Sequence, residues 1–269
     1  MKWNILSYDS PKIMGILNVT PDSFYDGGAY NSDAKIHERI SKMLVEGADI
    51  IDIGAYSTRP GAAEVSEQEE ISRLRKALNI IAKDFPTINI SIDTFRLAVV
   101  KVVYEEFGEF MVNDISGGCF DGEMFRYVGE KQLPYVCMHM QGTPQTMQIQ
   151  PHYDDVVKEI MQFFKEKIAI AKECGISQFI VDPGFGFGKT VEQNYELMKH
   201  LQKLVNLQYP VLVGISRKSM IRAALNCTTD EALNGTTVLN TIALQKGAKI
   251  LRVHDVKAAK EALTLVQKC

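Results

Sequence analysis

Short apolar runs alternate with amphipathic helical patterns along nearly the whole chain of 269 residues. The runs are Ile13–Leu17, Ala48–Ile53, Ile88–Ile92, Phe110–Val112, Pro134–Met138, Ile176–Val181, Val211–Ile215 and Ile250–Val253. They are apolar throughout rather than every second residue, which is typical of parallel strands buried on both faces. Eight strand–helix units in about 250 residues predict an α/β protein with a single (β/α)8 TIM barrel. A doubly wound open sheet is the alternative.

The patterns between these runs predict the helices that connect parallel strands. Expected helices start at Asp33 and Ser66 and cover Arg96–Phe107, Tyr153–Glu173, Gln193–Leu207 and Val256–Gln267, and one or two further pieces follow Lys218 up to Gly247. Ser66 with Glu69 has the spacing of a capping box. No linker or change of composition divides the chain, so residues 1–269 are predicted to form one domain.

The stretch Asp182–Thr190, DPGFGFGKT, is the most distinctive loop. A buried strand leads into its acid, three alternating glycines follow, and a helix is expected to start at Thr190. Its glycine spacing fits neither a P-loop nor the dinucleotide-binding fingerprint. The loop therefore predicts either a binding residue at a strand end or a glycine-rich turn without a ligand.

Composition narrows the classes of partner. The net charge is −3, which predicts no general attraction to nucleic acid or to membranes. No apolar stretch approaches the roughly 20 residues of a membrane helix, and residues 1–11 lack the pattern of a signal peptide. Five cysteines without a Cys-x-x-Cys pair predict reduced thiols in a cytoplasmic protein, and the Cys and His spacings fit no zinc site. Basic residues gather late in the chain, at Lys189, Arg217, Lys218, Arg222 and Arg252, which indicates a local anion site.

Polar residues stand at the C-terminal ends of the predicted strands, where a barrel has its active site. They are Asn18, Asp52, Asp93, Asn113, His139, Asp182, Lys218 and the pair Arg252/His254. Each has an ordinary explanation by itself, such as a helix N-cap or a histidine satisfied in the core. Together they predict a site with two halves. Asp93, Asn113 and Asp182 suit a ring with several N–H donors, whereas Lys218, Arg252 and His254 suit a phosphate-like anion, with Asn18 beside it for the anion or for Mg²⁺.

Eight motifs in order give the chain a resemblance to the dihydropteroate synthase family. They are Asn18–Phe24 (NVTPDSF), Ser57–Gly61 (STRPG), Ile92–Thr94 (IDT), Asn113–Gly117 (NDISG), Met138–Pro144 (MHMQGTP), Asp182–Lys189 (DPGFGFGK), Ser216–Ser219 (SRKS) and Arg252–Asp255 (RVHD). The resemblance implies a (β/α)8 barrel that condenses 6-hydroxymethyl-7,8-dihydropterin diphosphate with 4-aminobenzoate, giving 7,8-dihydropteroate and diphosphate for folate synthesis. It also implies a Mg²⁺ cofactor and a homodimer formed through late helices. No pyrophosphokinase or aldolase domain precedes the predicted barrel, so the chain resembles the monofunctional bacterial form.

The resemblance also implies residue roles. It assigns the pterin to Asp93, Asn113, Asp182, Ile115, Met138, Phe187 and Gly214, with Lys218 reaching both substrates. It assigns the binding of diphosphate and Mg²⁺ to Arg252, His254 and Asn18. It assigns the binding of 4-aminobenzoate, or of sulfonamides, to Phe24, Thr58, Arg59, Pro60 and Ser219. The catalytic set is Lys218, Asp26, Arg59, Arg252 and His254, with Asp26 expected to face a developing pterin cation. One departure stands in the second loop, where Ala55-Tyr56 replaces the family's frequent Gly-Glu.

Two other functions are consistent with part of this pattern. A pterin-binding methyltransferase domain would keep the acidic set but needs no anion site. A non-catalytic pterin-binding paralogue would be expected to lose loop residues such as Asp22, Asp26 or Arg59, and all three are present.

Residues 19–31 and 54–66 are long, polar loops of the kind that close over substrates. We therefore expect 4-aminobenzoate to bind well only with diphosphate and Mg²⁺.

Overall fold

The computed structural model describes residues 3, 8–20, 33–56, 65–147, 149 and 151–269. Within them, eight parallel strands form one sheet in the order β6-β5-β4-β3-β2-β1-β8-β7. The strands are β1 (Lys12–Asn18), β2 (Ile50–Gly54), β3 (Asn89–Asp93), β4 (Met111–Asp114), β5 (Tyr135–Met138), β6 (Phe179–Asp182), β7 (Leu212–Val213) and β8 (Ile250–Val253). A parallel bridge between Val181 and Val211 joins β6 to the start of β7, so the sheet closes on itself. The predicted (β/α)8 barrel is confirmed.

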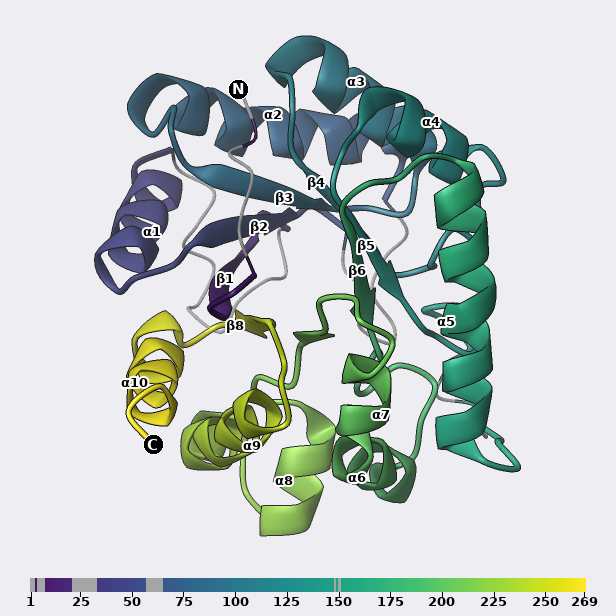
Figure 1. Ribbon diagram of the computed structural model, residues 1–269. Coiled ribbons are helices and arrows are strands. Elements are labelled where there is room, and N and C mark those ends of the chain that lie inside the picture. The colour runs from purple at the N-terminus through teal and green to yellow at the C-terminus, as the bar shows by residue number, and fades with distance from the viewer. Residues whose placement is uncertain (1–2, 4–7, 21–32, 57–64, 148, 150) are drawn as a thin grey trace.

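Helices surround the strands (Figure 1). They are α1 (Asp33–Val45), α2 (Glu67–Asp84), α3 (Leu97–Phe107), α4 (Met124–Lys131), α5 (Val156–Glu173), α6 (Val191–Lys199), α7 (Leu201–Val205), α8 (Ser219–Leu225), the 3-10 helix η1 (Asp230–Ala232), α9 (Leu233–Gln245) and α10 (Val256–Val266). No helix in the described ranges has the length and apolar character needed to cross a membrane. In Figure 1, α10 packs beside β8 and α1, which brings the C-terminal helix next to the first β–α unit.

The apolar strand residues form two clusters, one on each face of the strands. The smaller cluster takes one residue from most strands: Met14, Ile50, Met111, Val136, Ile180, Leu212 and Ile250, with Trp3 against them. Their neighbours in sequence, such as Ile51, Val181 and Leu251, belong to the larger cluster that includes the helices. Because strand side chains alternate, the smaller cluster is the inner floor of the barrel. Residues two positions further along each strand therefore also face inward, at the carboxyl end.

Several sequence predictions need correction. The helix α4 was not among those predicted. The expected helix at Gln193–Leu207 is divided at His200 into α6 and α7, and β7 is shorter than its apolar run. Ser66 caps α2 by accepting from the backbone N–H of Glu69. The Glu69 carboxylate accepts from Arg73 rather than from the backbone N–H of Ser66, so the predicted capping box is incomplete. The capping box lies at the start of α6, where Thr190 and Gln193 satisfy one another.

The position of α4 depends on Gly129. A Cβ atom built there would lie 1.8 Å from the backbone oxygen of Cys174, at the end of α5. We predict that Gly129→Ala lowers the free energy of unfolding by about 1–3 kcal/mol through steric overpacking. Gly122→Ala is the matched control, since no atom lies within 4 Å of a Cβ built there. Chemical denaturation measures both. An increase in stability at Gly129, as helix propensity alone would give, would contradict the packing of α4 on α5.

Candidate active site

An ion-paired network crosses the barrel lumen at the carboxyl ends of the strands. Asp52 Oδ2 accepts from Nε of Arg252 at 2.7 Å and lies 2.7 Å from its Nη2, and Asp93 Oδ2 accepts from the same Nη2 at 2.6 Å. Both oxygens of Asp52 also lie 3.3 Å from Nδ2 of Asn113. The network therefore joins β2, β3, β4 and β8. It places side chains from both predicted halves of the site in direct contact.

Burial and charge oppose one another in this network. Burial raises the pKa of Asp93, and the guanidinium of Arg252 lowers it. For Arg252, burial lowers the pKa, but the carboxylates of Asp52 and Asp93 outweigh that effect and raise it. Arg252 is therefore permanently cationic. The net effect on Asp93 is a pKa raised to about 7, because burial and the nearby carboxylate of Asp52 outweigh the attraction of the guanidinium.

Asp182 and Lys218 form a second charged group next to this network. The carboxylate of Asp182 ends β6 and accepts from the backbone N–H of Gly184 at 2.8 Å. Burial raises the pKa of Asp182, and the ammonium group of Lys218 opposes that shift. Burial also lowers the pKa of Lys218 to about 8. The ammonium donates to the carbonyl of Phe185 and lies 4.7 Å from the ring centroid of Phe187.

His254 and Asn18 lie at the ends of neighbouring strands. The backbone N–H of His254 donates to Oγ of Ser216 at 3.2 Å. Burial lowers the pKa of the His254 imidazole to about 4, and Arg252 adds to that shift, so the ring is neutral near pH 7. A Cβ built at Gly54 would lie 3.3 Å from Oδ1 of Asn18 and 3.6 Å from Oδ2 of Asp93. The Asn18 amide oxygen thus lies at the same end of the lumen as the acids.

Three of the residues predicted to contact the pterin lie at the carboxyl ends of the strands. Ile115 and Met138 are buried directly after or at the end of their strands, and Gly214 follows β7 beside Arg252. Ser219 is exposed as the first residue of α8. Phe24, Asp26, Thr58, Arg59 and Pro60, and also Asp22, lie outside the described residues.

His139 does not join the site. It follows Met138, which faces inward, and alternation therefore directs His139 outward. Its ring packs 4.9 Å from that of Phe163 on α5 and 6.0 Å from that of Tyr153. Burial lowers the pKa of His139 to about 2, so it is a neutral packing residue.

Lys189 and Arg217 hold local structure rather than forming an anion site, and burial lowers the pKa of Lys189 to about 7. The ammonium of Lys189 is buried and donates to the carbonyls of Phe187 and Gly184, each at 2.9 Å, and to that of His139 at 3.3 Å. Arg217 pairs with Asp255 through two 2.9 Å contacts. Lys189 holds the glycine loop in the shape that presents Asp182 and Phe187.

Tyr56, which stands where the family frequently has Glu, packs against residues at the carboxyl ends of the strands. Its ring meets Phe95 edge-on at 5.3 Å, and the guanidinium of Arg96 lies 5.1 Å from the Tyr56 centroid. Gln145 donates to the Tyr56 hydroxyl at 3.2 Å. The tyrosine thereby links the segments after β2, β3 and β5, where an acidic residue would rely on ion pairing.

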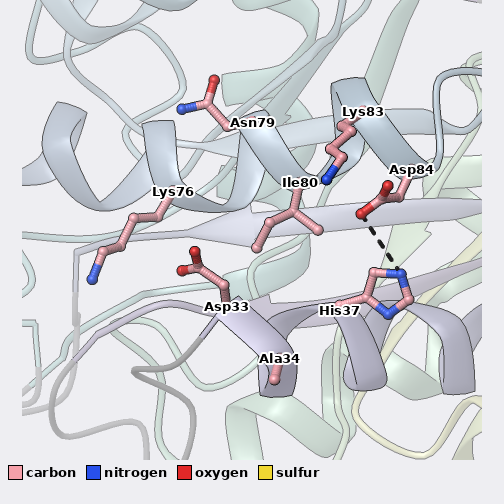
Figure 2. A pocket seen from close by; sticks show the side chains of 8 residues that line it. All are labelled: Asp33, Ala34, His37, Lys76, Asn79, Ile80, Lys83 and Asp84. Atoms are coloured by element: carbon pink, nitrogen blue, oxygen red, sulfur yellow. Dashed lines mark ion pairs between the residues drawn. The ribbon is translucent and has the colours of Figure 1, made fainter.

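A separate groove of about 480 Å³ lies between α1 and α2, outside the strands (Figure 2). It is lined by Asp33, Ala34, His37, Lys76, Asn79, Ile80, Lys83 and Asp84. Figure 2 shows His37 turned toward Asp84, and the two are 3.7 Å apart. This groove shares no residue with the network in the lumen.

The donor set fits a magnesium ion that is bound mainly through a ligand. Across the described part of the chain, no cluster of three or more His, Cys, Asp or Glu side chains could hold a metal by itself. Asn18 offers one amide oxygen at the lumen end. Mg²⁺ is commonly held by one or two protein oxygens together with phosphate oxygens, so Asn18 fits that arrangement.

Comparison with known proteins decides the family. The model of a family described as pterin binding enzyme matches residues 14–254. The dihydropteroate synthase of Escherichia coli K12 is 44% identical over 97% of this chain and 93% of its own length. The chain belongs to the dihydropteroate synthase family. It is therefore a transferase, and the resemblance found in the motifs is confirmed.

Solved structures of dihydropteroate synthases agree with this assignment. The Yersinia pestis enzyme in a sulfonamide drug complex has a TM-score of 0.91 and 42% identity, over 98% of this chain and 95% of that one. The Xanthomonas albilineans enzyme in complex with 7,8-dihydropteroate has a TM-score of 0.85 and 36% identity, over 98% and 95% of the two chains. The motifs did not predict that Arg252 contacts both Asp52 and Asp93 in the lumen of this barrel.

We predict that Lys189→Met destabilises the glycine loop and the protein. The change leaves the carbonyls of Phe187 and His139 without this donor, whereas the carbonyl of Gly184 keeps the backbone N–H of Phe187. Each buried group without a partner costs about 1–3 kcal/mol, so we expect a loss of about 3 kcal/mol in the free energy of unfolding. Lys203→Met, on the exposed side of α7, is the control and should change stability by less than about 0.5 kcal/mol. Denaturant titration distinguishes them. Equal stability of the two variants would show that Lys189 does not hold the loop.

Proposed function

We propose that the chain catalyses the dihydropteroate synthase reaction. The observation that carries the proposal is a barrel lumen in which inward-facing acids lie beside two partly buried cations, Lys218 and Arg252. Acids suit a ring with N–H donors, and cations suit a diphosphate. The names of the three relatives and the 7,8-dihydropteroate complex of the Xanthomonas enzyme support the same chemistry.

The pterin half would use the acids and the amide. Asp182 and Asp93 accept ring and amino N–H groups through charge-assisted hydrogen bonds, and Asn113 supplies an amide between them. Ile115, Met138 and Phe187 cover the ring, and Gly214 leaves the backbone bare beside Arg252. A methyltransferase domain would need these acids but not the adjacent cations, so the cations favour the synthase.

In the diphosphate half, Lys218, Arg252 and His254 stabilise the leaving group. The C–O bond to the methylene carbon of the pterin breaks, and its electron pair leaves with the diphosphate oxygen. The 4-aminobenzoate nitrogen then forms the C–N bond and loses a proton. Preorganised cations contribute most where charge develops, at the departing oxygen. Mg²⁺, held by Asn18 and diphosphate oxygens, would neutralise part of that charge when bound.

The second-substrate pocket is assigned by motif alone. We assign 4-aminobenzoate, and the sulfonamides that resemble it, to Phe24, Thr58, Arg59, Pro60 and Ser219, and the stabilisation of positive charge on the pterin to Asp26. The sulfonamide complex of the Yersinia enzyme supports the binding of sulfonamides, and the residues of the pocket are taken from the motifs. Ser219 starts α8 directly after Lys218, so it lies next to the cation that reaches both substrates.

The reaction is tested by supplying both substrates with Mg²⁺ and measuring diphosphate and 7,8-dihydropteroate. We expect one diphosphate for each dihydropteroate. Asp182→Asn should weaken pterin binding at least tenfold, because a charge-assisted bond contributes about 1.5–3 kcal/mol. Asp84→Asn is the control, since Asp84 ends α2, away from the carboxyl ends of the strands. Absence of diphosphate release by the wild-type protein would overturn the proposed function.

We also infer a homodimer through α9 and the helices beside it. This helix of 13 residues, LNGTTVLNTIALQ, carries no charged side chain, yet Val238 is 50% exposed, and Leu233 and Leu225 nearby are also exposed. Such a surface suits burial against a second copy. Val238→Glu should produce a monomer in sedimentation experiments, whereas Val45→Glu, on α1, should leave the dimer intact. A wild-type protein that sediments as a monomer would contradict the inference.

We place the reaction in the cytoplasm, in a chain that folds as one domain. All five cysteines lie within the described ranges and carry free thiols, as expected in a reducing compartment. The small-molecule substrates and the net charge of −3 call for no nucleic acid or membrane partner.

A further inference from the structure

We propose that Asp52 is a positioning residue that keeps Arg252 in place across the lumen while Asp93 exchanges the arginine for the pterin. The inference rests on the proposed function, because it concerns how that site accepts its ring. Asp52 takes no part in the reaction proposed above. It differs from Asp93 in its depth in the barrel, in the number of its contacts with Arg252 and in its contact with Asn113.

Asp52 lies deeper in the barrel than the acid that would meet the substrate. It pairs in register with Ser91 of β3, whereas Asp93 pairs with Gly54, two residues further toward the carboxyl end. The side chain of Asp52 is 0% exposed, compared with 19% for Asp93 and 20% for Arg252. A ligand entering from the strand ends therefore meets Asp93 and Arg252, and Asp52 stays beneath them.

Arg252 rises along the lumen past Asp52. It pairs with Met14 of β1, and Met14 pairs with Ile50 of β2. Arg252 thus leaves its strand below Asp52, and its guanidinium reaches up to Asp93. Asp52 contacts two nitrogens of the guanidinium, Nε and Nη2, but Asp93 is hydrogen-bonded only at Nη2. Asp52 therefore holds the side of the guanidinium that includes Nε, and Asp93 contacts its more exposed nitrogen, Nη2.

Asp52 also orients an amide of the site. Both of its oxygens lie 3.3 Å from Nδ2 of Asn113. A carboxylate accepts but cannot donate, so the NH2 group of Asn113 faces Asp52, and its oxygen is left for other donors. One buried acid therefore fixes two groups, the guanidinium and the amide, that contact the ligand in the proposed site.

The charge balance explains why two acids are needed. In the proposed exchange, Asp93 turns away from Nη2 of Arg252 as it accepts a pterin N–H group, and its bond to the arginine weakens. A buried cation that loses its only partner is strongly destabilised, and Asp52 prevents that loss. Without the carboxylate of Asp52, Asp93 would be the one acid of the network that is hydrogen-bonded to Arg252, with Asp182 acting only through its more distant charge. It would then stay with the arginine rather than turn to the ring.

The test measures binding of 6-hydroxymethylpterin by calorimetry. We expect Asp52→Asn to weaken binding at least tenfold in the otherwise unchanged chain. In an Arg252→Met background, where no arginine competes for Asp93, the same change should alter affinity less than threefold. Ser91→Ala is the matched control: Ser91 is buried at the same register position, and its Oγ has no hydrogen-bond partner in the described part of the chain. It should bind as the wild type does.

Each outcome decides the matter. If the wild type binds the pterin and Asp52→Asn binds equally well, the inference is wrong and the proposed function stands. If the wild type does not bind it, the proposed function fails and the inference falls with it. A tenfold loss that persists in the Arg252→Met background would show that Asp52 acts without the arginine, which overturns the mechanism. If Asp52→Asn does not fold alone, Asp52→Asn/Arg252→Met is compared with Arg252→Met, and a tenfold difference again overturns it.

Discussion

Three carboxylates, from Asp52, Asp93 and Asp182, face the lumen at one end of this barrel, and their mutual repulsion must be met by buried cations. Arg252 lies between the first two, with contacts of 2.6–2.7 Å, and the charge of Lys218 opposes the effect of burial on Asp182. The barrel can close around these acids because each acid has a cation near it. The same pairing leaves both signs of charge available to a substrate that carries N–H donors at one end and diphosphate at the other.

Because side chains alternate along the strands, the groups proposed to bind the substrate and the groups that hold the loops lie on opposite faces of the strands. Inward positions carry the apolar floor and, two residues further, the polar groups of the site. Outward positions carry the groups that fix the loops. Asp114, for example, accepts from the hydroxyl of Tyr135 at 2.6 Å and from the backbone N–H of Ser116 at 2.7 Å, which fixes the segment that holds Ile115. Lys189 does the same for the glycine loop through three carbonyls. Precise placement of the ligand groups therefore depends on polar side chains that never meet the ligand.

Much of this could be predicted from sequence, for identifiable reasons. Apolar runs at regular intervals predicted the barrel, since buried parallel strands leave a strong pattern. Parity could also have directed His139 outward and Asp52 inward, had it been applied to each strand. The direction of the Lys189 ammonium could not have been found this way, because it depends on three carbonyls brought together by the folded loop. The helix α4 has only eight residues, and Gly129 within it is explained by the backbone of Cys174 rather than by local preference.

In the proposed site, Asp52 holds Arg252 while Asp93 turns to the substrate. A crystal structure of the protein with a bound pterin would show both acids at once. We expect Nε of Arg252 to stay within hydrogen-bond distance of Oδ2 of Asp52, near the present 2.7 Å, while Asp93 leaves Nη2 and accepts from the pterin ring. A complex in which Asp93 keeps Arg252 and Asp52 loses it would show that Asp52 does not hold the arginine.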